Sequence, residues 1–283
     1  MNDLKILILG ANGQLGRQFQ KELLNRNINY LAPNKKECDI TLFDNIRQFI
    51  ETKKPNYIIN CAAYNAVDNA ESNSELVFLI NHKSVENIAK ICKDNNIFFI
   101  QYSSDYVFDG RKGDLYSESD SVNPLNVYGK SKLAGENSVL DILNNSLVLR
   151  LSWAYGDGNQ NFIYKLKDWA SKNHILKISS DEVSIPTNTY DIVKATLDLI
   201  KIKATGLFHL TNSNYCSRYE WARFVLDTLN LDNIIIPVPM SNFQSLAQRP
   251  LFSPMLNDKI CSILNYKLPD WRTSTQKYLI GDL

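Results

Sequence analysis

A tyrosine and a lysine four residues apart are the side chains of this sequence best suited to chemistry. In the segment Tyr128-Gly-Lys-Ser-Lys132 both lie on one face of a predicted helix, because residues i and i+4 are neighbours there. A free tyrosine hydroxyl has a pKa of about 10. A nearby cation stabilises tyrosinate and lowers that pKa, which improves proton exchange. We therefore interpret Tyr128 as a proton donor to a carbonyl oxygen, with Lys132 as the cation.

Ser104 follows the predicted strand Phe98–Tyr102 and supplies a hydroxyl that could orient the same carbonyl oxygen. In a doubly wound sheet, the carboxyl ends of the strands line the ligand crevice. A Tyr-x-x-x-Lys pair arises often by chance, and an ordinary surface pair is the plain alternative. Its place in the chain, after a glycine-rich loop and a Ser-Ser strand end, favours the catalytic interpretation.

The glycine-rich loop contains Gly10, Gly13 and Gly16, between a predicted strand Lys5–Leu9 and a predicted helix Gln14–Arg26. Gly10 permits the sharp turn out of the strand, Gly13 lets a pyrophosphate approach the backbone, and Gly16 lets the helix pack closely on the sheet. Exposed N–H groups and the positive helix end then favour phosphates. Glycines in a loop can also mark a plain strand–helix turn. Their position at the first strand–helix unit favours a dinucleotide site.

The end of the second predicted strand, Ile28–Ala32, bears on the choice between NAD(H) and NADP(H). An acidic residue usually binds the ribose 2′-hydroxyl of NAD at this place. The sequence has Pro33-Asn-Lys-Lys36 instead, with Glu37 just beyond. Two lysines could pair with a 2′-phosphate, although they are equally consistent with solvated loop charges. We expect NADP(H) to be preferred weakly, with NAD(H) as the alternative.

Short apolar runs alternate with amphipathic stretches over the first two-thirds of the chain. After the first strand–helix unit and the second strand, the predicted elements are a helix 42–52, a strand 57–60, a helix 75–94, a strand 98–102, a helix from 126 and a strand 147–151. This alternation predicts right-handed βαβ units and an α/β fold with a Rossmann-type, doubly wound parallel sheet.

After Trp153 the alternation loosens, which predicts a smaller C-terminal substrate-binding lobe. The elements predicted after Trp153 are helices 162–171, 189–200 and 217–229, a strand near Ile178, an apolar run 207–210 that could return to the sheet, and proline-broken segments near 236–239 and 268–271. We predict a nucleotide-binding domain at residues 1–152, completed by about 186–210. Residues 153–185 and 211–283 form the predicted lobe.

Composition limits the classes of partner and the compartment. Hydrophobic residues make up 44% of the 283 residues, enough for a sizeable core, and 31 Lys and Arg nearly cancel 30 Asp and Glu. No global field favours nucleic acid or a membrane surface, so we expect neither as a partner. The five cysteines and three histidines lie scattered, without disulfide or metal-ligand spacing. The sequence starts without a signal-peptide pattern, so we expect a cytoplasmic protein without a metal.

Together these segments resemble the dTDP-4-dehydrorhamnose reductases, a family of the extended short-chain dehydrogenase/reductase superfamily. The matching segments are 10–16, 60–71, 102–110, 128–136, 150–155, Asn161-Phe162, Pro186-Thr187, Arg249-Pro250 and 268–272, which cover nearly the whole chain. The superfamily match is very specific. The substrate match is less so, because relatives acting on other deoxysugars share most of these segments.

The resemblance implies an NAD(P)H-dependent enzyme that reduces the 4-keto group of a nucleotide-linked 6-deoxy sugar, dTDP-4-dehydro-L-rhamnose foremost. It implies a catalytic triad of Ser104, Tyr128 and Lys132. The expected cofactor-binding residues are Gly10, Asn12, Gly13, Gln14, Leu15, Gly16, Asp39, Ile40, Cys61, Ala62, Ala63, Tyr64, Tyr102, Tyr128 and Lys132. The expected substrate-binding residues are Val67, Ser104, Tyr106, Tyr128, Trp153, Asn161 and Arg249. Of these, Asn161 and Arg249 are expected near the nucleotide diphosphate, and a surface ion pair is the plain alternative for Arg249.

Two other functions stay open at this point. An epimerase or dehydratase on the same fold needs extra acidic groups beside the tyrosine, and Asp105 is one candidate. A cofactor-binding regulatory subunit that has lost the reaction would not need an intact Ser104, Tyr128 and Lys132. Some relatives dimerise around a metal held by C-terminal carboxylates. This tail lacks a clear acidic cluster, so we expect no metal and treat a homodimer as an open expectation.

Overall fold

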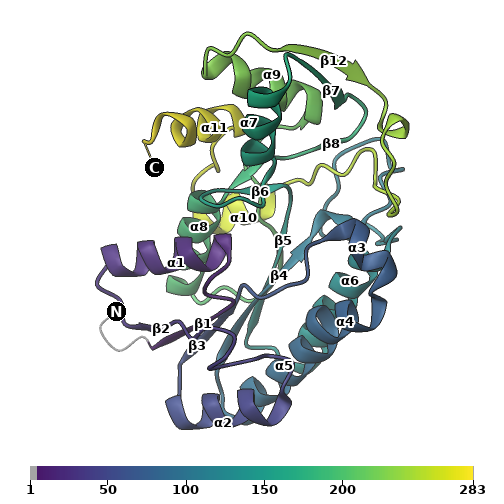
Figure 1. Cartoon of the computed structure of the whole chain (residues 1–283). Helices are drawn as coiled ribbons and strands as arrows, with labels where there is room; N and C mark the ends of the chain where they lie inside the picture. The colour runs from purple at the N-terminus through teal and green to yellow at the C-terminus, as the bar shows by residue number, and fades with distance from the viewer. Residues whose placement is uncertain (1–4, 283) are drawn as a thin grey trace.

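A six-stranded parallel sheet forms the centre of the computed structural model, which describes residues 5–282 (Figure 1). Its strands are β1 (Ile6–Leu9), β2 (Tyr30–Leu31), β3 (Tyr57–Asn60), β4 (Phe98–Ser104), β5 (Ser146–Leu151) and β10 (Gly206–His209). They lie in the order β10-β5-β4-β3-β1-β2, and every neighbouring pair is parallel. The predicted α/β class with a parallel sheet is therefore confirmed.

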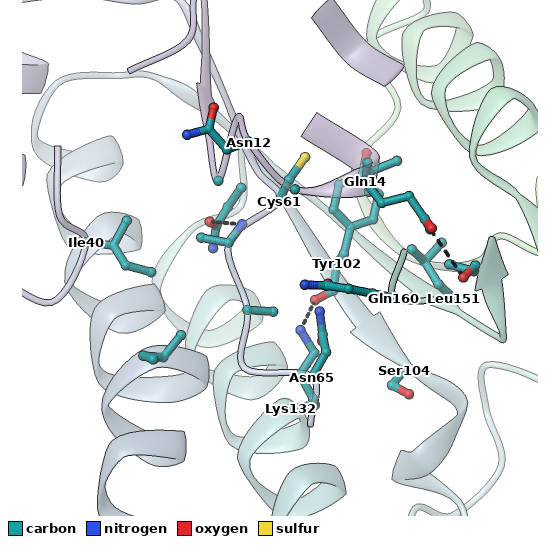
Figure 2. A pocket seen from close by; sticks show the side chains of 18 of the residues that line it. Asn12, Gln14, Ile40, Cys61, Asn65, Tyr102, Ser104, Lys132, Leu151 and Gln160 are labelled. Carbon is teal, nitrogen blue, oxygen red and sulfur yellow. Dashed lines mark hydrogen bonds between the residues drawn. The ribbon is translucent and has the colours of Figure 1, made fainter. Parts of the chain in front are cut away.

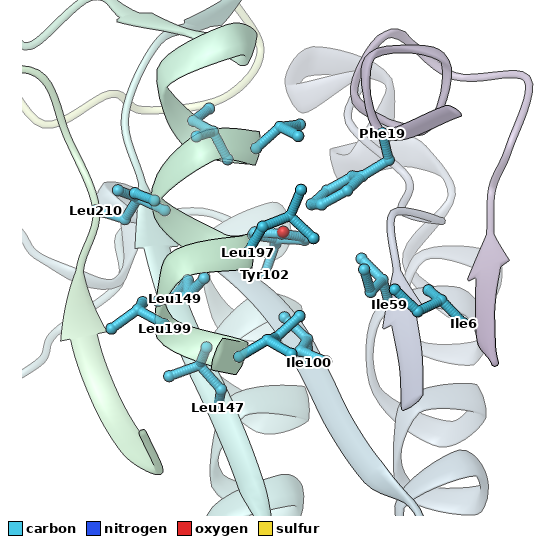
Figure 3. Packing of buried hydrophobic residues seen from close by; sticks show 14 of the residues in the cluster. Ile6, Phe19, Ile59, Ile100, Tyr102, Leu147, Leu149, Leu197, Leu199 and Leu210 are labelled. Atoms are coloured by element: carbon cyan, nitrogen blue, oxygen red, sulfur yellow. The ribbon is translucent and has the colours of Figure 1, made fainter. Parts of the chain in front are cut away.

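Helices cover both faces of this sheet, which explains why its strands are mostly apolar. One face carries α1 (Gln14–Asn25) and α8 (Thr189–Lys201); the other carries α2 (Phe43–Lys53), α5 (Ser84–Asp94) and α6 (Val127–Ile142). Alternate residues of a strand enter the two layers, so Ile6 and Ile8 join the first core and Leu7 and Leu9 the second. Figure 3 shows Phe19 of α1 and Leu197 of α8 above the sheet residues Ile100 and Tyr102.

The strand order reverses between β1 and β3, and the loops that leave these two strands lie against each other. Gly10 follows β1 with a φ of 72°, a conformation that favours glycine. A Cβ on Gly10 would lie 2.5 Å from the backbone nitrogen of Ala62, so a side chain there would separate the loops. Ligands of open α/β sheets bind at such a reversal.

A second group of elements packs above the carboxyl ends of the sheet, at the top of Figure 1. Its helices are α7 (Phe162–Lys172), α9 (Arg218–Thr228) and α11 (Trp271–Ile280). Its strands pair as β7 (Ile175–Ser179) with β12 (Ile234–Val238), β8 (Val183–Ser184) with β11 (Cys216–Ser217), and β6 (Ala154–Tyr155) with β9 (Thr187–Asn188). Tyr155, Trp221 and Trp271 are the largest side chains of its core. The division of the chain into two domains stays a prediction.

Several elements differ from their predicted form. The helix predicted at 75–94 consists of α4 (Ser74–Phe78), a π-helical turn η1 (Leu79–Lys83) and α5, and it is preceded by α3 (Val67–Ser72). The proline-broken segment near 236 forms β12, which pairs with β7 alone, so Pro237 can lie in this short strand. Helices α10 (Asp258–Leu264) and α11 were not predicted, and Ile260 of α10 joins the core of the sheet.

Among residues 5–282, no helix is both long enough and apolar enough to cross a membrane.

An ion pair between Glu136 of α6 and Arg150 of β5 fixes the helix that carries Tyr128 and Lys132. The two side chains are 1% and 3% exposed, and Arg150 Nε and Nη2 both donate to the carboxylate, at 3.0 and 2.5 Å. The guanidinium also lies 5.0 Å from the ring centre of Phe108 and 3.3 Å from Nε2 of His209. A bidentate pair of this kind gives both distance and orientation.

We predict that Glu136→Gln lowers the free energy of unfolding by about 3–5 kcal/mol, because it leaves the buried Arg150 guanidinium without its counter-charge. Urea denaturation followed by circular dichroism measures the change. The matched control is Glu51→Gln, which breaks an exposed pair with Arg47 and should cost less than about 1 kcal/mol. Equal losses in the two variants would contradict this account.

Candidate active site

A cavity of about 590 Å³ opens at the carboxyl ends of β1, β3, β4 and β5, beneath the upper group of elements. It is lined by the glycine loop, by the segments after β3 and β4, by α6 and by the chain after β5. Figure 2 shows Lys132 and Ser104 on one side of this cavity and Asn12 on the other. The cavity thus joins the predicted dinucleotide loop to the predicted catalytic residues.

Ser104, Tyr128 and Lys132 all line this cavity. Tyr128 lies in the first turn of α6, which begins after Asn126, whose side chain accepts a hydrogen bond from the Gly129 N–H at 2.7 Å. Lys132 follows one turn later and its Nζ donates to the carbonyl oxygen of Tyr102 at 2.6 Å. Because the start of α6 is fixed by its cap, both side chains face the end of β4.

Burial raises the pKa of Tyr128 to about 12, although a hydrogen bond with Ser104 opposes the shift. The carboxyl of Asp105 adds to the rise. This differs from the lowered pKa that the sequence predicted from the Lys132 cation. The reason is that burial dominates the shift of the Tyr128 pKa, while the Lys132 ammonium donates to the Tyr102 carbonyl. In the protein alone, Tyr128 is therefore a protonated phenol at neutral pH.

Lys132 is 4% exposed, and burial lowers the pKa of its amine to about 8, with the Glu136 carboxylate opposing the change. The amine is charged at neutral pH, but only by a small margin. Perturbed titrations of this kind are typical of active sites, where burial and charged neighbours act together.

The Asp105 carboxyl, next to Ser104, is buried and surrounded by hydroxyl groups. Ser104 donates to Oδ1 at 3.1 Å, and Ser184 and Ser253 donate to Oδ2 at 2.8 and 2.7 Å. Burial raises the pKa of Asp105, and these hydrogen bonds only partly offset the rise. The sequence analysis did not anticipate this arrangement, because the serines come from three distant segments.

Most of the residues predicted to bind the cofactor line the cavity. These are Gly10, Asn12, Gly13, Gln14, Leu15, Asp39, Ile40, Cys61, Ala62, Ala63, Tyr102, Tyr128 and Lys132. Gly16 and Tyr64 do not belong to the lining. A Cβ on Gly16 would lie 2.5 Å from the carbonyl oxygen of Gly10, so this glycine lets α1 pack on its own loop. The assignment of all these residues, lining or not, to the cofactor stays a prediction.

Asn81, in the π-helical turn η1, holds the segment that contains Tyr64. Its Oδ1 accepts from the Tyr64 N–H at 2.8 Å, and its Nδ2 donates to the Tyr64 carbonyl and to Ser131 Oγ at 3.1 and 3.0 Å. The loop after β3 is thereby tied to α6. Sequence reasoning missed Asn81, because a single asparagine within a predicted helix gives no signal of its partners. π-helical turns occur frequently at functional sites.

Val67, Tyr106, Trp153 and Asn161 were predicted to bind substrate, and all four line the cavity. The Tyr106 ring lies edge-on to the Tyr128 ring, with centroids 5.7 Å apart. Asn161 caps α7 and donates from Nδ2 to Gln14 Oε1 at 2.9 Å, so it joins the upper elements to the glycine loop.

Arg249 does not line the cavity. Both oxygens of Asp68 accept from its guanidinium, at 3.1 and 2.6 Å, and the alternative of an ion pair is therefore realised. Its predicted contact with a nucleotide diphosphate stays a prediction, and it would require this ion pair to open.

Lys35 lines the cavity near the end of β2, whereas Lys36 does not. The Lys35 ammonium lies 3.8 Å from the Asp39 carboxylate and its side chain is mostly exposed. Burial alone would raise the pKa of Asp39, but hydrogen bonds from Thr41 and the charge of Lys35 lower it. Glu37 does not line the cavity, and its carboxylate accepts from the Asn34 N–H at 2.8 Å. One lysine is therefore available to a phosphate here.

Comparison with known proteins identifies relatives along the whole chain. The family model described as "RmlD substrate binding domain" matches residues 4–281. A dTDP-4-dehydrorhamnose reductase of Aggregatibacter actinomycetemcomitans is 34% identical over 281 residues, which cover 95% of this chain and 96% of the relative.

Two solved structures share the fold closely. A dTDP-4-dehydrorhamnose reductase of Clostridium acetobutylicum has a TM-score of 0.95 and 35% identity, covering 99% of this chain and 100% of that chain. A dTDP-4-dehydrorhamnose reductase of Bacillus anthracis, solved in complex with NADP, has a TM-score of 0.95 and 30% identity. The match covers 99% of this chain and 100% of that chain.

The lowered pKa of Lys132 gives a pH-dependent contribution to stability. Between about 8 and its ordinary value of 10.5, the unfolded chain keeps a proton that the folded protein has lost, so this contribution rises with pH. We predict that the unfolding free energy of the wild type, minus that of Lys132→Met, increases between pH 8 and 10.5 by about 1.4 kcal/mol per unit. Denaturant titrations of both proteins measure it, and subtraction removes the other alkaline groups. A difference that is flat or falls with pH would refute the assignment.

Proposed function

Since the chain belongs to the dTDP-4-dehydrorhamnose reductase family, we propose that it uses NADPH to reduce the 4-keto group of dTDP-4-dehydro-L-rhamnose, giving dTDP-L-rhamnose. The observation that carries the proposal is the position of Ser104, Tyr128 and Lys132 in the same cavity as the glycine loop. A hydroxyl, a phenol and an ammonium beside a dinucleotide loop suit carbonyl reduction.

The residues at the glycine loop fit a dinucleotide. Gly13 is the N-cap of α1 and no side chain caps this helix, so the helix end that faces the cavity can favour negative charge. The segment Cys61–Ala63 faces this loop across the strand reversal, and Lys132 reaches into the same space. When bound there, the reduced nicotinamide supplies the hydride that the keto carbon receives.

The protein's own groups then complete the reaction. Tyr128 gives its hydroxyl proton to the keto oxygen, which becomes the new hydroxyl of the sugar. Its raised pKa keeps that proton in place until the oxygen gains charge. Ser104 donates a hydrogen bond that orients the same oxygen, and the Lys132 ammonium stabilises the tyrosinate that remains.

The walls of the cavity match a deoxy sugar. Val67, Tyr106 and Trp153 offer apolar and aromatic surface to the parts of the ring that lack hydroxyls. The upper elements that carry Trp153 and Asn161 form the substrate-binding lobe in this proposal. A homodimer and a cytoplasmic location stay predictions.

For the cofactor we propose that Lys35 pairs with the 2′-phosphate of NADPH. In support, Lys35 lines the cavity and no carboxylate of the segment 33–37 does, since Glu37 binds Asn34. The solved relative from Bacillus anthracis also contains NADP.

We predict that Tyr128→Phe lowers kcat at least about a hundredfold while the dissociation constant of NADPH changes less than threefold, because the proton donor is lost and the fold is kept. Loss of NADPH absorbance with dTDP-4-dehydro-L-rhamnose measures the rate, and protein fluorescence quenching measures cofactor binding. Normal turnover in this variant would show that another group protonates the oxygen.

We predict that Lys35→Met raises the KM for NADPH about tenfold and leaves the KM for NADH within twofold, because only NADPH carries the 2′-phosphate. Lys36→Met is the matched control, since Lys36 is the exposed neighbour outside the cavity lining. Should both cofactors be affected equally, or should Lys36→Met have the same effect, Lys35 would not read the phosphate.

The epimerase or dehydratase alternative is separated by the cofactor balance, because such enzymes return the hydride to their product. Asp105, their candidate acid, is already bound by serine hydroxyls. One NADPH consumed per sugar supports the reductase. Turnover of the sugar without net NADPH loss would favour the alternative.

A further inference from the structure

Arg218 is a cavity-lining residue to which the sequence analysis gave no role. It is the first residue of α9, directly after the cap Ser217, and its backbone N–H donates to the Glu182 carbonyl at 3.1 Å. A complete capping box between Ser217 and Glu220 fixes this helix start. The base of the Arg218 side chain is therefore held firmly at the edge of the cavity.

The Arg218 guanidinium lies on the indole of Trp153, with Cζ 3.5 Å from the ring centroid. Trp153 has a φ of 38°, a backbone conformation that costs a bulky residue about 1–3 kcal/mol and persists only where neighbours hold it. Trp221 stacks with Trp153 at 5.9 Å between centroids and provides part of that hold. Trp153 and Arg218 thus form one rigid unit in the cavity wall.

Most hydrogen-bond donors of this guanidinium remain available to a ligand. Within residues 5–282 its side chain forms a single ion pair, from Nε to Glu182 Oε2 at the long distance of 3.6 Å, and no hydrogen bond. The side chain is 19% exposed and borders the cavity. Stacking on an aromatic face leaves the in-plane N–H groups of arginine free to bind an acceptor.

The charges along the cavity indicate which acceptor this is. Among its described lining residues the cationic side chains are Lys35, Lys132 and Arg218. Lys35 lies beside Asp39 at the end of β2, and Lys132 is bonded to Tyr102. Arg218 is therefore the lining cation that the upper elements contribute. Arg249, which lies outside the lining, is paired with Asp68. The diphosphate of a nucleotide sugar carries two negative charges, which suit a cation at this wall of the cavity.

We propose that Arg218, held flat on Trp153, binds the diphosphate of the nucleotide sugar through its Nη groups. The inference rests on the proposed function for the identity of the substrate. It assigns the diphosphate to Arg218, whereas the sequence had predicted Arg249 for that place. A guanidinium fork matches two phosphate oxygens, and its position before binding reduces the entropy lost on binding.

The test uses dTDP as the probe, with the cofactor site saturated by NADP⁺, and measures dissociation constants by isothermal titration calorimetry. Arg218→Met keeps apolar contact with Trp153 and removes the donors. It should weaken dTDP at least about tenfold, while the dissociation constant for NADP⁺ stays within twofold. Arg218→Lys should show a smaller loss, since it retains the charge without the fork. The matched control Arg223→Met, on the exposed side of the same helix, should bind dTDP like the wild type.

Steady-state kinetics separate diphosphate binding from mere support of Trp153. If Arg218 binds the diphosphate, Arg218→Met raises KM for the sugar substrate by the same factor as the dTDP dissociation constant. Unchanged dTDP affinity in Arg218→Met overturns the proposal, and a fall in kcat alone would reduce Arg218 to a positioning residue for Trp153. A wild type that does not bind dTDP at all overturns the proposed substrate together with this inference.

Discussion

The buried ion pair between Glu136 and Arg150 is the interaction on which the rest of the site depends. It joins α6, which carries Tyr128 and Lys132, to β5, which pairs with β4, the strand that ends at Ser104. Tyr128, Lys132 and Glu136 are spaced four residues apart along α6, so the carboxylate that anchors the helix also faces the lysine amine. The Glu136 side chain therefore both anchors α6 and acts on the charge of Lys132. The positions of the Tyr128 hydroxyl and the Lys132 ammonium thus depend on an ion pair in the protein core.

A second constraint acts at the reversal of strand order between β1 and β3, where two loops contact each other through backbone atoms. Gly10 admits the loop after β3, and Asn81 ties that same loop to α6. The cofactor surface is therefore built from two backbone segments whose separation is fixed from both sides. Little freedom remains in this part of the cavity, which agrees with a site that binds a large ligand without rearrangement.

Sequence reasoning predicted the features that follow from local patterns. The strands were predicted from short apolar runs, and most helices and the Tyr128–Lys132 spacing from the helical period of 3.6 residues, which can be recognised without knowledge of tertiary contacts. Helix α10 was missed because its seven residues are too short for a clear period. The binding of Arg249 by Asp68, 181 residues away, and the position of Arg218 on Trp153 depend on tertiary contacts. A predicted arginine therefore proved to be occupied, and an unpredicted one lies open to the cavity.

The hydrogen bonds of Gln14 link the two halves of the protein. Gln14 donates to the Ala154 carbonyl and accepts from Asn161, while Arg17 donates to the Asp157 carbonyl, so the first turns of α1 are attached to the chain that leads into α7. Any molecule that displaces Gln14 must also disturb the cap of α7. By thermodynamic linkage, the affinities of two ligands that meet at this junction then alter each other by the same factor.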